Sequence, residues 1–207
     1  HFRDLVAQDK DVEGLRGTRW YHNPRQKAKW KDTCQTVLPC TARSVQAILE
    51  RYHSWNDQTS SWFGQVVSIV NRSEIIGRPL AAMLAAKGAT VYSIDERTVI
   101  KFLPYGERLQ RCNNAFQDCL AQSHIIVTGV PHEDFQIPIE CVAHGATLVN
   151  VSEFTNVNEE SLLNRTDVRY IPQVGKVTVA LLEDNLIQLH RRRLQSSNPN
   201  SIASVTS

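Results

Sequence analysis

One strand, helix and strand segment constrains the fold more than any other part of the chain. VVSIV (66–70) is a short β-branched run typical of a buried strand, and ATVYSID (89–95) is a second one. Between them, LAAMLAAK (80–87) has helical composition, with Pro79 in its first turn and Gly88 directly after its end. Such a succession within about 30 residues is a βαβ unit, whose strands are parallel. The sequence therefore predicts an α/β fold with a doubly wound, Rossmann-like parallel sheet.

Further apolar runs extend this unit. We expect strands at IIVTGV (125–130), ATLVNVS (146–152) and VRYIP (168–172). Residues 97–122 are ambiguous, apart from a helix expected at 114–122. Two amphipathic helices are also expected, one that starts at Thr41 as its cap and one over 177–190 that closes the domain.

Composition narrows the class of protein. The 207 residues carry 23 Lys and Arg against 21 Asp and Glu, and this balance argues against a polyelectrolyte partner. No apolar run approaches the roughly 18 residues of a membrane span. The five cysteines, an odd number without a C-x-x-C pair, argue against a disulfide framework or a zinc site. We therefore expect a cytoplasmic protein with no membrane, nucleic-acid or metal partner.

One segment leaves nucleic-acid binding open. Between residues 16 and 31, basic residues alternate with Trp20, Tyr21 and Trp30, a pattern found in nucleic-acid contacts. We favour a solvated loop, because the cluster is short and the overall charge is balanced.

The turn after the first strand is a candidate phosphate site. Dinucleotide folds place the amides of a helix N-terminus against the pyrophosphate, usually behind a G-x-G-x-x-G loop. Here only Gly77 of that pattern is present, and Arg72 and Ser73 would contribute a cation and a hydroxyl. An unliganded turn between strand and helix is the alternative.

Asp95 strengthens the dinucleotide interpretation. It ends the second strand about 20 residues further on, where an acid accepts hydrogen bonds from the ribose hydroxyls. A carboxylate there would repel a 2′-phosphate, so NAD is expected rather than NADP. The alternative is that Asp95 is a turn residue at a strand end.

Cys40 is a second candidate. It directly precedes the helix expected from Thr41, and the positive end of a helix dipole lowers a thiol pKa. The alternative is a small, buried apolar residue.

Four segments resemble one known family. The stretch NRSEIIGRPLAAMLAAKGATVYSID (71–95) resembles the G-R-S-x-x-V-G-x-P cofactor segment of methylenetetrahydrofolate dehydrogenases. KDVEGL (10–15) is similar to the family's K-D-V-D-G, LPCTARSVQAIL (38–49) to its P-C-T-P segment, and VGKVTVALL (174–182) to its G-V-G-P-M-T-V-A. The chain has Asn71 in place of the family's first glycine, and it has Asp95 at the end of the second strand. In these two positions it resembles the monofunctional NAD-dependent fungal type.

The resemblance implies oxidation of 5,10-methylenetetrahydrofolate with hydride transfer to NAD, in the one-carbon metabolism that supports purine biosynthesis, by a homodimer. It implies a substrate role for Glu13, which would hold the pterin ring, and a position for Cys40 in the catalytic cleft. The implied cofactor contacts are Arg72, Ser73, Asp95, Glu96, Val151, Ser152 and Glu153.

One departure from the family concerns the catalytic lobe. The family's Tyr-x-x-x-Lys helix and Q-x-P-L-P turn do not occur in this chain. We therefore expect that the N-terminal part of that lobe is missing, that 1–54 is its remnant, that 55–190 is the NAD-binding domain, and that 191–207 is a disordered tail. A non-catalytic NAD-binding module derived from the enzyme is the alternative.

Overall fold

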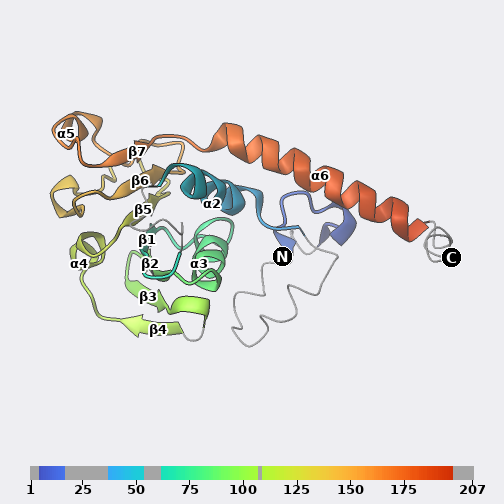
Figure 1. Ribbon diagram of the computed structural model, residues 1–207, viewed down its shortest axis with the longest axis horizontal. Coiled ribbons are helices and arrows are strands. Elements are labelled where there is room, and N and C mark those ends of the chain that lie inside the picture. Colours follow the sequence, from blue (N-terminus) through green and yellow to red (C-terminus); the bar gives the residue numbers. More distant parts are fainter. Residues whose placement is uncertain (1–4, 17–36, 54–61, 107–108, 198–207) are drawn as a thin grey trace.

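The computed structural model describes residues 5–16, 37–53, 62–106 and 109–197. Its centre is a seven-stranded sheet in the order β4-β3-β2-β1-β5-β6-β7 (Figure 1). The basic stretch 16–31 lies outside the described residues, except for Arg16, and stays a prediction.

Five neighbouring strands of the sheet are parallel, and two at one edge are antiparallel. β1 pairs in parallel with β2 and with β5, and β6 and β7 continue the parallel part beyond β5. β3 runs antiparallel to β2, and β4 antiparallel to β3. The strands are β1 (Val66–Val70), β2 (Thr90–Asp95), β3 (Thr98–Phe102), β4 (Leu109–Cys112), β5 (Ile125–Thr128), β6 (Thr147–Asn150) and β7 (Arg169–Ile171).

Helices cover both faces of the sheet (Figure 1). The α-helices are α2 (Cys40–Tyr52), α3 (Gly77–Ala86), α4 (Phe116–Ala121), α5 (Glu159–Leu163) and α6 (Gly175–Ser197), and the 3-10 helices are η2 (Gln8–Lys10), η5 (Pro104–Gly106) and η6 (Ile139–Cys141). One buried cluster joins α2, α3 and the start of α6 to the sheet, and a second joins α4 and η6 to the other face. Neighbouring strand residues such as Ile125 and Ile126 enter opposite clusters, which is the pattern of a sheet buried on both sides.

The predicted βαβ unit is confirmed, since β1 and β2 are parallel and α3 lies between them in the chain. The doubly wound α/β fold is confirmed with it. The ambiguous region before α4 is an antiparallel hairpin of β3 and β4, which the sequence analysis missed. The cap predicted at Thr41 is wrong, because α2 already begins at Cys40 with Pro39 as its N-cap.

The last helix is longer than predicted. α6 continues to Ser197, so the disordered tail that we expected from residue 191 is corrected for residues 191–197, which form a regular helix. Residues 198–207 lie outside the described residues. The boundary at residue 54 stays a proposal, although α2 shares its core with the sheet.

The described residues offer neither a membrane-spanning helix nor a metal-binding cluster. No helix there is long and apolar enough to cross a membrane. That part of the chain also holds no group of three His, Cys, Asp or Glu side chains placed to bind a metal ion.

Candidate functional site

The carboxyl ends of β1, β2, β5 and β6 meet at one edge of the sheet. Because β2 lies on one side of β1 and β5 on the other, the chain changes direction across the sheet at β1. In open α/β sheets, ligands bind outside the strand ends at such a switch point. This edge is therefore where a ligand of such a sheet would bind.

The turn between β1 and α3 has a backbone shape that few residues accept. Asn71 has φ +97°, and its side-chain amide donates to the carbonyl oxygen of Gly129 after β5. Asparagine is one of the few residues besides glycine that tolerate positive φ. A Cβ atom on Gly77 would collide with the Asn71 carbonyl oxygen. The glycine retained from the family pattern is thus required by packing within the turn.

Ser73 stabilises the turn that leads into α3. Its Oγ accepts from the backbone N–H groups of Ile76 (3.1 Å) and Gly77 (3.2 Å). These amides belong to the N-terminus that would face a diphosphate. A bound phosphate oxygen would have to share or replace the Ser73 hydroxyl.

Arg72 points toward the β2–β3 hairpin. Its side chain is only 6% exposed, and Nη1 lies 3.8 Å from Oδ2 of Asp95. The guanidinium donates to the hydroxyl and carbonyl oxygens of both Ser93 and Thr98, at 2.6–3.2 Å. Burial lowers the pKa of Arg72, and the nearby Asp95 opposes that change. These contacts occupy most of the donors that we expected to serve the diphosphate, so direct contact with the cofactor stays a proposal.

Asp95 and Glu96 lie at the rim of an open groove. The Asp95 side chain is 53% exposed, and its Oδ1 accepts from the backbone N–H of Glu96. The groove has a volume of about 480 Å³, and Arg97 and Arg111 line it together with the two acids. Asp95 is thus accessible to a ligand, as a ribose-binding carboxylate must be.

Residues 151–153 continue from β6 toward the loop after β5. Ser152 donates from Oγ to the carbonyl oxygen of Val130 (3.0 Å), whereas Glu153 is exposed. Val151 packs so closely on Gly129 that its Cγ2 would lie 2.7 Å from a Cβ atom there. The structure therefore places these residues beside the strand ends, where a cofactor could contact them.

Glu13 and Cys40 share a small cavity of about 160 Å³. The backbone N–H of Cys40 donates to the carbonyl oxygen of Glu13 (3.2 Å). Ile75, from the β1–α3 turn, also lines this cavity, along with Thr178 and other residues of α6. The cavity and the candidate phosphate turn are therefore neighbours.

Of the two interpretations of Cys40, the structure favours the small buried residue over the activated thiol. The side chain is buried, and burial raises the pKa of its thiol above the ordinary value. Cys40 begins α2, but desolvation, together with the nearby charge of Glu13, outweighs the hydrogen bonds with Thr41 that lower the pKa. The structure supports the alternative of a small, mostly buried thiol that packs at the edge of the cavity.

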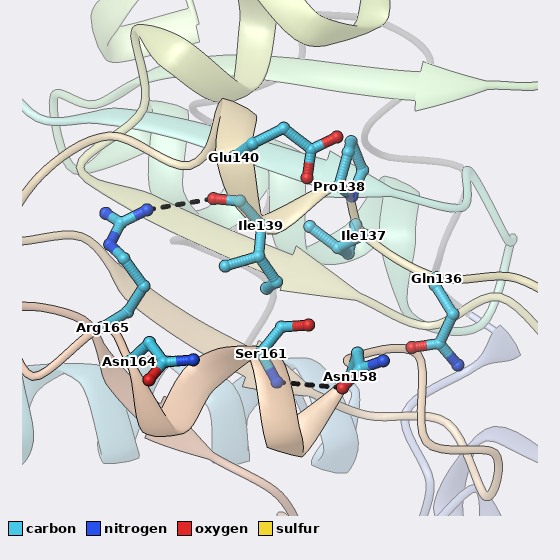
Figure 2. Close-up of a pocket in the computed structure, with 9 residues that line it drawn as sticks. All are labelled: Gln136, Ile137, Pro138, Ile139, Glu140, Asn158, Ser161, Asn164 and Arg165. Atoms are coloured by element: carbon cyan, nitrogen blue, oxygen red, sulfur yellow. Dashed lines mark hydrogen bonds between the residues drawn. The ribbon is translucent and has the colours of Figure 1, made fainter.

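A larger cavity lies away from all of these residues. It has a volume of about 470 Å³ and lies between the loop 136–140 and α5 (Figure 2). Arg165 donates to the carbonyl oxygen of Ile139 across it, and Asn158 caps α5 by accepting from the backbone N–H of Ser161. None of the predicted site residues lines this cavity.

Buried asparagines were missed by the sequence analysis. Asn156, which is fully buried, accepts from the backbone N–H of Val130 (2.9 Å) and the hydroxyl of Thr128 (3.1 Å). It also donates to the Val130 carbonyl oxygen, so it fixes the loop that follows β5. Asn71, which is only half-buried, was already singled out because it stands where the family has a glycine. Asn156 gives no such signal, because its partners are distant in the chain.

Comparisons with known proteins agree with this geometry. Residues 39–194 match the family described as tetrahydrofolate dehydrogenase/cyclohydrolase, NAD(P)-binding domain. The chain is similar to methylenetetrahydrofolate dehydrogenase [NAD(+)] of Saccharomyces cerevisiae, with 34% identity over 92% of this chain and 64% of the relative. It is also similar to the protein of that name from Schizosaccharomyces pombe, with 37% identity over 91% and 62% of the respective chains.

A solved structure shows the same arrangement of elements. It is the NAD-dependent 5,10-methylenetetrahydrofolate dehydrogenase from Saccharomyces cerevisiae, with a TM-score of 0.81, 31% identity, and coverage of 94% of this chain and 66% of that one. The chain thus spans just under two thirds of the length of these relatives.

Proposed function

The chain belongs to the tetrahydrofolate dehydrogenase/cyclohydrolase family, and from that membership we propose that it oxidises 5,10-methylenetetrahydrofolate to 5,10-methenyltetrahydrofolate with hydride transfer to NAD. One observation carries the proposal. The turn 71–76 borders the strand ends on one side and contributes Ile75 to the cavity of Glu13 and Cys40 on the other. Cofactor and folate sites that share one turn would bring the two reacting carbons together, and hydride transfer depends on such positioning.

The residues on the cofactor side fit a dinucleotide. The exposed carboxylate of Asp95 can accept hydrogen bonds from ribose hydroxyls. The N-terminus of α3 provides the positive end of a helix dipole for a diphosphate, whose oxygens would replace the Ser73 hydroxyl at the amides of Ile76 and Gly77. Glu96, Ser152 and Glu153 are proposed as further contacts around it, with Val151 packing behind them. When bound, NAD supplies the hydride acceptor.

The residues on the folate side fit a flat, polar ring system. Glu13 is exposed at the mouth of the cavity, and its carboxylate can accept two hydrogen bonds from the amino group and ring nitrogen of a pterin. Leu15, Ile75 and Leu182 give the cavity an apolar wall. We propose that this wall and Cys40 exclude water from the reacting carbon.

The proposal is tested by mixing the protein with 5,10-methylenetetrahydrofolate and NAD and following NADH formation by its absorbance. Appearance of NADH that requires both reactants supports it. Binding of NAD without any NADH would overturn it in favour of the non-catalytic NAD-binding module.

The resemblance also suggests a homodimer that acts in the cytoplasm. Analytical ultracentrifugation over a range of protein concentrations tests the oligomeric state. A single species with the mass of one chain, 23.4 kDa, at every concentration would rule out the dimer.

A further inference from the structure

Asn185 lies within α6 and is completely buried. Asparagine is a poor residue for a helix interior, and a buried amide is costly unless it is hydrogen-bonded. Here its Nδ2 donates to the carbonyl oxygens of Val12 (2.9 Å) and Leu38 (3.0 Å). These partners are 173 and 147 residues away in the chain, so the side chain joins three distant segments.

The orientation of the Asn185 amide is determined by its partners. Arg43 donates from Nη1 to Oδ1 of Asn185 (3.2 Å), and the same nitrogen forms an ion pair with Asp184 (2.6 Å). A guanidinium can only donate, and the two backbone carbonyls can only accept. The oxygen must therefore face Arg43, and the two N–H groups must face Val12 and Leu38.

The two bonded carbonyls belong to the segments that carry the folate-side residues. Val12 directly precedes Glu13, and Leu38 is two residues before Cys40. The segments also touch each other, because a Cβ atom on Gly14 would lie 2.7 Å from the carbonyl carbon of Leu38. Asn185 thus bonds to the backbone of both segments that line the cavity, next to Glu13 in one and two residues before Cys40 in the other.

We propose that Asn185 is a positioning residue for the folate half of the site, which fixes Glu13 and Cys40 at the spacing a pterin ring requires. The inference rests on the proposed function for its ligand. The role proposed for Asn185 does not extend to the proposed NAD site. The corresponding buried amide there is Asn156, which is bonded to Thr128 and Val130. The two asparagines therefore provide a matched pair for a test.

The first measurement follows the backbone directly. Asn185→Asp keeps the size and the acceptor for Arg43 but removes both N–H donors. Loss of two hydrogen bonds should release the bond from the Cys40 N–H to Glu13, so we expect hydrogen exchange of segments 12–15 and 37–41 to become about tenfold faster or more. In the control Asn156→Asp, exchange of these segments should stay within about twofold of the parent chain.

The second measurement compares the two ligands. Calorimetric titration of Asn185→Asp should show tetrahydrofolate binding weakened by about tenfold, with NAD affinity within about twofold of the parent. Asn185→Ser, which keeps one donor, should give intermediate values, and it serves if the Asp variant does not fold.

The outcomes separate the two claims. Unchanged exchange in 12–15 and 37–41, or equal weakening of both ligands, would overturn the role of Asn185. A parent chain that binds no tetrahydrofolate would overturn the proposed function, whereas faster exchange in the Asn185 variants would still show that this residue holds the two segments.

Discussion

At the scale of single residues, Arg72 has a structural role in addition to its proposed contact with the cofactor. We expect Arg72→Ala to lower the free energy of unfolding by about 1–3 kcal/mol, because the Ser93 and Thr98 oxygens lose a buried, charged donor. Urea unfolding measures this change. The exposed Arg97→Ala is the control, with an expected effect within about 0.5 kcal/mol. Equal stability of Arg72→Ala and the parent would contradict the structural role.

Asp95 is the residue that we expect to discriminate between cofactors. A 2′-phosphate beside its carboxylate would be repelled, whereas Arg72, Arg97 and Arg111 nearby would attract it. Asp95→Asn should therefore weaken NAD and strengthen NADP, each by about tenfold. Calorimetric titrations with both cofactors give the ratio of the two affinities, and Glu133→Gln, at an exposed position outside the groove, controls for the loss of one negative charge. Equal affinity of the parent chain for NAD and NADP would rule out this role.

Cys40 should be unreactive in the folded protein. Burial raises its thiol pKa, so the thiolate forms only at pH values above the ordinary range. We expect iodoacetamide at neutral pH to modify Cys40 about tenfold more slowly in the native chain than in urea, as read by mass spectrometry of its peptide. Equally fast modification in both conditions would restore the activated thiol that the sequence suggested.

At the scale of elements, the sequence predicted what short-range patterns encode. The βαβ unit follows from β-branched runs and from Pro79 and Gly88 around α3, which are local signals. The β3–β4 hairpin was missed because β4, with the sequence LQRC, has no apolar alternation and forms only by pairing with β3. The contact of Arg72 with Thr98 could not be predicted either, because Thr98 lies on β3.

In the candidate site, as in the fold, the sequence predicted the residues that local patterns or the family resemblance mark, and it did not predict those defined by distant contacts. Asp95 was located by the rule that ligands gather at strand ends, and its exposure fits that role. The pairing of Glu13 with Cys40 came from the family resemblance, and the structure brings both to one cavity. Asn156 and Asn185 could not be predicted, because their function depends on carbonyl groups far away in the chain.

His53 makes the connection between α2 and the sheet sensitive to pH. Directly after α2, its ring bonds with Thr147 of β6 (2.7 Å) and with Gln65 before β1 (3.3 Å). Burial lowers its pKa below the ordinary 6.5. The unfolded chain therefore takes up a proton first as the pH falls, and the stability contributed by neutral His53 is present above pH 6.5 and decreases below it.

Urea unfolding of the parent chain and of His53→Gln at pH 7.5 and at pH 5.5 tests this element. We expect the parent to lose more stability than the variant between the two values, by up to about 1.4 kcal/mol, the free energy equivalent of one pH unit. The exposed His132→Gln is the control and should keep the pH dependence of the parent. A variant with the full pH dependence of the parent would show that His53 does not contribute it.

At the scale of the whole molecule, the groove beside Asp95 and the cavity of Glu13 and Cys40 are built on the same sheet and the helices that cover it. α6 closes the cavity through Thr178 and Leu182 and anchors its walls through Asn185, while its first residues join the core beneath the sheet. A ligand that binds the strand ends should therefore stabilise the entire fold cooperatively rather than one loop.

NAD should consequently raise the midpoint of thermal unfolding of the 207-residue chain. At about 100 times its Kd, a ligand that binds only the folded state adds about 2.7 kcal/mol, or roughly 5–10 °C for a domain of this size. Differential scanning calorimetry with NAD, NADP and ADP-ribose measures the effect. Because Asp95 and the α3 N-terminus face the adenosine and diphosphate parts in our proposal, ADP-ribose should retain most of the shift and NADP little of it. A shift that nicotinamide alone reproduces would mean that these residues do not hold the cofactor, and the groove beside Asp95 would lose its proposed role.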